Sequence, residues 1–246
     1  MIVGTPSGIS LAPEGGAHQS IGTPLIGMTQ DGLTSFEPAF ADELAIVMKW
    51  GFEHMQAKDG GATYLRLTTR PLEQPHRHIT TDLQRDMLAG AYWWRSPGPN
   101  CQLVIAYQGA VADQAIRAAG QIAEYRRDVA VLAITSADRL HSGLTEAQRR
   151  RRDGDTALSH IELMLDRVPQ HTKLLTVIDG HPATLSWLGG VCGHSTLAQG
   201  VDHFGQTGTV NDLYQHYRLD TASLVETALA MTPGRQPFAD FQRVAS

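Results

Sequence analysis

The chain has 246 residues, of which 42% are hydrophobic and 18% are charged, with a formal net charge of −5. This composition excludes an intrinsically disordered chain, and the length suits one large domain or two ordinary ones. The acidic balance argues against nucleic acid as a partner, two cysteines argue against a disulfide framework, and no apolar run of about 18 residues predicts a membrane span.

The N-terminal region is predicted to hold a long loop, one helix and one strand. Residues 4–34 are rich in Gly, Pro, Ser and Thr, which favour loop over helix, and loops of this length are usually functional. Apolar residues recur at helical spacing over 38–56, and Thr63–Thr68 alternates like a strand. Ile2–Thr5 has the composition of a strand end without a strand start, which is unusual for the beginning of a domain.

The stretch from 70 to 100 has the features of a linker. Its prolines are Pro71, Pro75, Pro97 and Pro99. We therefore predict the later part of one domain at 1–75, a linker at 76–100 and a second domain at 101–246. The aromatic cluster Tyr92–Trp94 is expected to pack the linker onto a domain face.

Beyond residue 100, apolar strands alternate with helices. Strands are predicted at 101–107, 129–135, 174–178 and 196–203, and helices at 111–125, 159–168, 183–191 and 221–231. This alternation indicates an α/β fold with a mainly parallel sheet that helices cover on both faces. Because the N-terminus lacks the basic and apolar segments of a signal peptide, we expect a cytoplasmic protein.

Two histidines lie where a site could form. His18 is in the glycine-rich loop, and an imidazole there can donate or accept a proton near pH 7, although bonding to the loop backbone is the alternative. His181 follows the predicted strand 174–178, at the end where open α/β sheets often bind ligands, but a turn-stabilising role is at least as well supported. His76 and His78 are interpreted as surface residues, and no metal-ligand spacing or nucleotide fingerprint is found.

The motif PEGGAHQS at residues 13–20 resembles the Glu-Gly-x-x-His-Gln signature of the pyrimidine-binding domain in thiamine-diphosphate-dependent enzymes of the transketolase-like superfamily. Its flanks are similar to the homodimeric type of pyruvate dehydrogenase, the decarboxylating component of the 2-oxoacid dehydrogenase complex. These flanks are GTPSG at 4–8, SIGTP at 20–24, EPAF at 37–40 and YLRLTTR at 64–70. The segments VIDGHPATLSWLG at 177–189 and GVDHFGQTG at 200–208 are similar to the C-terminal domain of the same enzymes.

The resemblance implies a partial pyrimidine-binding domain followed by a transketolase C-terminal-type domain. It implies an oxidoreductase that decarboxylates pyruvate and passes the acetyl unit to a lipoyl-bearing acyltransferase, with thiamine diphosphate and Mg²⁺ as cofactors. By this resemblance His18 is the catalytic residue at the reacting end of the cofactor, and Glu14 and Gln19 shape its loop. His181 and the turn 205–208 are expected to be structural, in a domain that supports a homodimer.

The sequence departs from this pattern in its cofactor-binding residues. It has no Gly-Asp-Gly…Asn segment for the diphosphate and Mg²⁺, and no upstream glutamate to activate the aminopyrimidine. We therefore expect the C-terminal portion of a longer enzyme, inactive without a complementing chain. One alternative is a transketolase-like ketol transferase, which is disfavoured because residues 4–34 contain no Lys or Arg. The other is a non-catalytic dimerisation or regulatory module.

Overall fold

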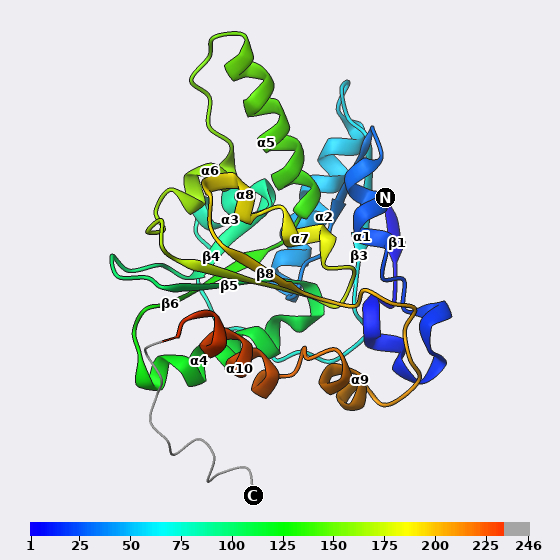
Figure 1. Cartoon of the computed structure of the whole chain (residues 1–246). Coiled ribbons are helices and arrows are strands. Elements are labelled where there is room, and N and C mark those ends of the chain that lie inside the picture. Colours follow the sequence, from blue (N-terminus) through cyan, green and yellow to red (C-terminus); the bar gives the residue numbers. More distant parts are fainter. Residues whose placement is uncertain (234–246) are drawn as a thin grey trace, which may run out of the picture.

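Two sheets dominate the structure. The computed structural model describes residues 1–233, in which three strands form one sheet and five form another. The smaller sheet, with its helices, lies beside the larger one (Figure 1). No helix within residues 1–233 combines the length and the apolar character that a membrane span requires.

The three-stranded sheet is parallel, with the order β1-β3-β2. The elements of this part are β1 (Ile2–Gly4), the 3-10 helices η1 (Gly8–Glu14) and η2 (Gly16–His18), α1 (Thr23–Thr29), β2 (Leu33–Phe36), α2 (Ala41–Gln56) and β3 (Ala62–Arg66). The predicted helix and strand are confirmed as α2 and β3. The region 4–34 is more structured than predicted, because Pro24 is accommodated in the first turn of α1 rather than breaking it.

The predicted linker contains two elements that were not expected from the sequence, α3 (Thr81–Ala89) and β4 (Ala91–Arg95). Thr80 caps α3 by accepting a hydrogen bond from the backbone N–H of Leu83, and β4 pairs antiparallel with a strand of the larger sheet. The predicted aromatic packing is confirmed, since Tyr92 is buried and Trp94 stacks on Phe40 with 5.2 Å between ring centroids. The division into domains stays a prediction.

The five-stranded sheet has the order β4-β6-β5-β7-β8, and all its pairs except β4–β6 are parallel. Its further elements are β5 (Leu103–Gln108), η3 (Gly109–Val111), α4 (Ala112–Tyr125), β6 (Val129–Ile134), α5 (Ala137–Arg152), α6 (His160–Leu165), β7 (Lys173–Ile178), α7 (Ala183–Ser186), α8 (Gly189–Cys192), β8 (Thr196–Gln199), α9 (Val210–His216) and α10 (Thr221–Met231). The predicted mainly parallel α/β sheet is therefore confirmed. Helices α5 and α9 were missed; in α5 only Ala137, Leu140 and Ala147 are buried, too few to give an apolar period.

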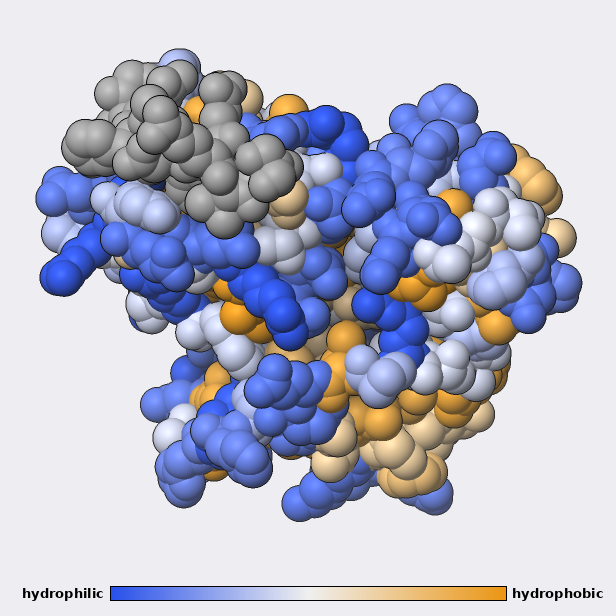
Figure 2. All heavy atoms as spheres, turned by 90° about the horizontal axis from the view of Figure 1, so that it is seen from below, coloured by the Kyte–Doolittle hydropathy of each residue, from blue (hydrophilic) through white to orange (hydrophobic). Residues whose placement is uncertain are grey.

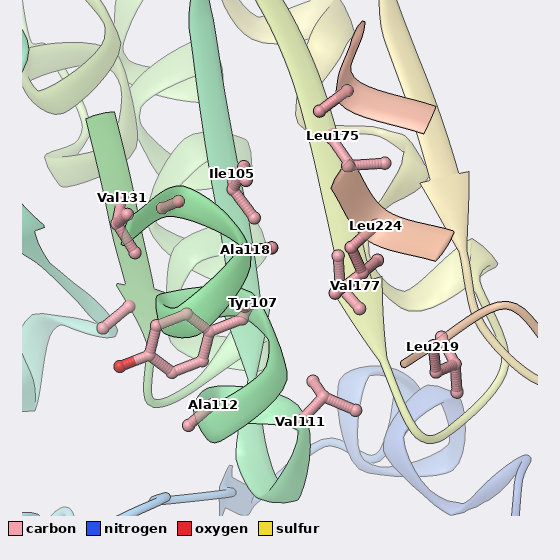
Figure 3. Packing of buried hydrophobic residues seen from close by; sticks show 14 of the residues in the cluster. Ile105, Tyr107, Val111, Ala112, Ala118, Val131, Leu175, Val177, Leu219 and Leu224 are labelled. Carbon is pink, nitrogen blue, oxygen red and sulfur yellow. The ribbon is translucent and has the colours of Figure 1, made fainter. Parts of the chain in front are cut away.

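The main core fills the space between this sheet and helices α4 and α10 (Figure 3). Buried strand residues that face these helices are Ile105, Tyr107, Val131, Leu175 and Val177. The alternating residues of the same strands pack in a second cluster on the opposite face, with Leu140, Ile161 and Leu188. Burial on both faces explains the continuous apolar runs of β5 and β6, and each buried Leu, Ile or Val contributes about 1.5–3 kcal/mol.

The carboxyl ends of the two sheets meet. Glu37 follows β2 and its N–H donates to the carbonyl of Thr135, which follows β6, at 2.7 Å. The Ser35 N–H donates to the carboxylate of Asp138 at 2.8 Å, and the Ser136 hydroxyl donates to the Ser35 carbonyl at 2.5 Å. Side chains at the ends of strands in both sheets are thereby brought to one place.

Candidate functional site

The predicted site residues lie in the two short 3-10 helices between β1 and α1. His18 ends η2, and its side chain is exposed and makes no hydrogen bond with residues 1–233. Gln19 is fully buried, whereas Glu14 is exposed and its carboxylate makes no hydrogen bond or ion pair in the described chain. The loop therefore presents His18 to solvent while Gln19 anchors it, and a role for Glu14 stays a prediction.

A second loop packs against the one that carries His18. The Gln19 side-chain amide donates to the carbonyl of Gln206 at 2.9 Å. Gly16 and Gly205 touch so closely that a Cβ on Gly16 would lie 2.6 Å from the backbone nitrogen of Gly205. The turn 205–208, which was expected to be only structural, thus holds the His18 loop in place.

We expect Gly16→Ala to destabilise the protein by about 1–3 kcal/mol, because the new methyl group meets backbone atoms of Gly205, which cannot swing aside, as well as the Phe204 ring. Urea unfolding monitored by circular dichroism measures this change. The matched control is Gly22→Ala, since a Cβ there meets no heavy atom within 4 Å and its φ of −84° suits alanine. Equal stability of the two variants would contradict the proposed close contact.

The opposite end of the His18 loop is seated on Asp179. Gly8, with φ +50°, lies against this residue, and a Cβ on Gly8 would be 2.3 Å from the Asp179 carboxyl carbon. The backbone N–H of Ile9 lies close enough to the Asp179 carboxylate to oppose the rise that burial causes in its pKa. The Ser7 N–H also donates to the Leu67 carbonyl at 2.7 Å, so the loop entrance is tied to both sheets.

Asp179 belongs to a buried polar cluster at the carboxyl ends of four strands, which consists of Glu37, Arg66, Gln108 and Asp179. The Arg66 guanidinium donates to the carboxylate of Glu37 and, at 3.4 Å, to that of Asp179; it also donates to the Asp179 carbonyl at 3.1 Å. The Gln108 amide donates to Glu37 Oε2 at 2.8 Å. Arg66, Glu37 and Asp179 are only 2%, 3% and 0% exposed, so two carboxyl groups share one guanidinium away from water.

Burial controls the protonation of this cluster. It raises the pKa of Glu37 to about 7, against the attraction of Arg66 and with additional repulsion from Asp179. Burial also raises the pKa of Asp179, which Arg66 and Arg70 oppose. One guanidinium cannot compensate two buried negative charges, so the cluster holds a proton near neutral pH.

The other histidines identified in the sequence have ordinary surroundings. His181 Nδ1 accepts a hydrogen bond from the Ala183 N–H at 3.2 Å, in agreement with a turn-stabilising role. His76 and His78 are exposed. Within residues 1–233, no group of three or more His, Cys, Asp or Glu side chains is arranged to hold a metal ion.

Glu37, Arg66 and Asp179 lie within the family-like segments of the sequence, but no role was predicted for them, and Gln108 was not considered. A signal was present for Gln108 and Asp179, because each comes at the end of an apolar strand, whereas the strands at Glu37 and Arg66 are not mainly apolar. The carboxyl ends of parallel strands share one edge of a sheet, which is where such side chains gather. What the sequence did not show is that the edges of two sheets face each other.

Comparison with solved structures finds the same fold in transketolases. The chain aligns with transketolase from Leishmania mexicana with a TM-score of 0.67 and 15% identity, over 98% of this chain and 32% of that one. For transketolase from Campylobacter jejuni the TM-score is 0.68 and the identity is 16%. This alignment covers 93% of this chain and 30% of that one. A split gene transketolase, described as an inactive beta4 tetramer, aligns with a TM-score of 0.62 and 16% identity. This alignment covers 89% of this chain and 65% of that one.

These likenesses establish a transketolase-like α/β fold, with mainly parallel sheets flanked by helices. The chain spans about a third of the length of the first two transketolases. No protein-family model and no curated protein matches the sequence.

Proposed function

We propose that this chain is the C-terminal portion of a thiamine-diphosphate-dependent pyruvate dehydrogenase (acetyl-transferring), to whose active site it contributes His18. The observation that supports this most is the exposed imidazole of His18 on a loop that is fixed from two sides. Gln19 and Gly16 attach the loop to the turn 205–208, and Asp179 attaches its entrance to β7. A side chain that is exposed but rigidly supported suits a catalytic task, because its position is set before substrate arrives.

The residues present do not fit the diphosphate end of the proposed cofactor. The described part of the chain holds no carboxylate and histidine group for Mg²⁺, and the 246 residues contain no Gly-Asp-Gly…Asn segment. Thiamine diphosphate and its metal would therefore be held mainly by residues outside this sequence. The contribution proposed for this chain is confined to one wall of the site.

The chemistry proposed for His18 follows from its position. An imidazole exposed to substrate can donate a hydrogen bond or a proton to an oxygen atom on which negative charge develops. A 2-oxoacid such as pyruvate supplies that oxygen in its keto group. The fixed loop would keep Nδ1 or Nε2 directed at this atom without reorganisation during the reaction.

A ketol transferase is the second candidate, and the transketolase fold of the solved neighbours favours it. A sugar phosphate substrate needs cationic side chains near the reacting group. Residues 4–34 contain no Lys or Arg, and the nearby Arg70 is engaged with Tyr214, over whose ring it lies at 4.6 Å. We therefore prefer the 2-oxoacid.

Exposed apolar side chains support a protein partner. Phe204, which is 73% exposed, contacts Gly16 of the His18 loop, and elsewhere in the N-terminal part Ile2, Val3 and Ile26 are also more than half exposed. Hydrophobic residues gather on one side of the face in Figure 2. A contiguous apolar patch on the surface usually marks an interaction site. We assign this surface to a second copy or a complementing chain, and the lipoyl acyltransferase would accept the product.

The test is pyruvate decarboxylation by the chain alone and with a polypeptide that carries the diphosphate-binding domain. We expect no turnover by the chain alone, turnover in the mixture, and a decrease of about 10²-fold for His18→Ala. His76→Ala, which alters an exposed linker histidine, is the matched control.

Turnover by the chain alone would contradict the proposed division of the site. Wild-type turnover by His18→Ala would remove its catalytic role. If the mixture binds no thiamine diphosphate in calorimetric titration, the chain is a non-catalytic dimerisation or regulatory module instead.

A further inference from the structure

A cleft of about 1020 Å³ lies apart from the His18 loop and the buried cluster. One wall is helix α5, and the other is formed by the end of α1 with the turn 30–33 and by the turn 59–61 after α2. In Figure 1, α5 rises beside this part of the smaller sheet. The volume is that of a small-molecule site, and neither His18 nor any residue of the buried cluster lines it.

Arg139 lies in this cleft and has no anionic partner. Its guanidinium makes no hydrogen bond and no ion pair with residues 1–233, and it rests on the rings of Trp50 and Phe36, at 4.7 and 5.8 Å from their centroids. The aromatic rings fix its plane. In-plane N–H groups of a guanidinium are the ones that bind a carboxylate or phosphate in bidentate geometry.

The lack of a carboxylate partner distinguishes Arg139 from Arg66, Arg77 and Arg126, each of which is shielded from water and forms an ion pair. Removal of water from Arg139 lowers its pKa, against the attraction of the neighbouring Asp138. Asp138 itself accepts a hydrogen bond from the Ser35 N–H and is not within ion-pair distance of Arg139. A guanidinium that is partly removed from water without an ion pair is destabilised. A bound anion would offset this cost at Arg139.

The rest of the lining limits the ligand. Asp31, Asp59 and Asp138 line the cleft, together with three histidines (His54, His141 and His160) and Arg149, which is paired with Glu146 at 3.8 Å. Three carboxylates would repel a polyanion, but they can accept hydrogen bonds from hydroxyl or ammonium groups. A ligand with one oxyanion and with hydrogen-bond donors at its other end therefore matches the cleft.

We infer that this cleft is a binding site for a small metabolite whose carboxylate or phosphate group pairs with Arg139. The inference does not depend on the proposed function, because no residue of the His18 site takes part. The proposed ligand site lies between the smaller sheet with its helices and helix α5 beside the larger sheet.

The experiment is titration of the ¹⁵N-labelled full chain with malonate and, separately, with inorganic phosphate, in buffer free of other oxyanions. We expect saturable changes in the amide chemical shifts of cleft residues with at least one of the two anions. The anion that binds more tightly indicates whether the ligand group is a carboxylate or a phosphate. Arg139→Gln should weaken binding at least tenfold. Arg117→Gln is the matched control, because Arg117 is exposed on α4 and its partner Asp113 is four residues away on the same helix.

A second variant covers the case in which Arg139→Gln does not fold. Gly143 lines the cleft on the exposed side of α5, and a Cβ there would meet no heavy atom within 4 Å, so Gly143→Trp should obstruct the cleft without disturbing the core. Gly120→Trp, at an equally open position on α4, is its control. The inference is overturned if neither anion binds to the wild-type chain, or if both cleft variants bind as tightly as their controls.

Discussion

Arg66→Met is expected to destabilise the protein by about 3–5 kcal/mol, enough to unfold a domain of ordinary stability. The substitution leaves the carboxyl groups of Glu37 and Asp179 buried without their shared cation. It also frees the Asp179 carbonyl, which accepts from the Arg66 guanidinium at 3.1 Å. Urea unfolding at pH 7.5, monitored by circular dichroism, measures the loss.

Two comparisons isolate the cause. Arg85→Met removes an ion pair with Asp82 in which the two side chains are 68% and 79% exposed, and we expect it to cost no more than about 1 kcal/mol. The triple variant Glu37→Gln, Arg66→Met, Asp179→Asn should regain part of the lost stability, because no unpaired charge stays buried. If Arg66→Met costs no more than Arg85→Met, the cluster does not stabilise the contact between the sheets.

The second large effect is a decrease of stability with rising pH. The pKa of Glu37 is about 7 in the folded chain, above the ordinary value of 4.5. Between these pH values the folded chain keeps a proton that the unfolded chain has lost, so the free energy of unfolding falls as pH rises through this window. Below pH 4.5 both states are protonated at this group, and above pH 7 the loss of about 3 kcal/mol is complete.

Glu37→Gln should remove this contribution. The glutamine amide cannot ionise, but its oxygen can still accept from Arg66. Its new N–H group would meet Gln108, whose own amide oxygen has no hydrogen-bond partner and can be turned towards it. The stability of the variant relative to the wild type should therefore increase by about 3 kcal/mol from pH 4 to pH 8.

The measurement is a series of urea titrations from pH 4 to pH 8 on both proteins. Asp179 and Glu43 are also buried with raised pKa values and contribute slopes of the same sign. The slope of Glu43, which lies outside the cluster, cancels when the two proteins are compared. A constant stability difference across this pH range would show that Glu37 carries no proton in the folded chain near neutral pH.

Much of the local structure was predictable because its signals are local. The runs at 101–107, 129–135 and 174–178 are mainly apolar, since β5, β6 and β7 are covered on both faces, and the parallel α/β sheet followed from them. Helix α5 has few buried residues and therefore no detectable period, and β4 was missed because it lies within the proline-containing stretch that was interpreted as a linker.

The candidate catalytic residue could be recognised from local features. His18 was identified by its residue type in a glycine-rich loop and by a motif, and both are properties of adjacent residues. What supports that histidine depends on contacts across long separations in the chain, because Gln19 bonds to Gln206 and Gly8 packs on Asp179.

The buried cluster shows most clearly what local sequence patterns cannot predict. Glu37, Arg66, Gln108 and Asp179 lie in different segments, and no local pattern indicates that the edges of two sheets face each other. Their protonation and their energetic role depend on the burial that this contact creates. A sequence specifies which groups can carry charge, but only the folded chain specifies how far each is removed from water, and this removal sets the pKa of Glu37.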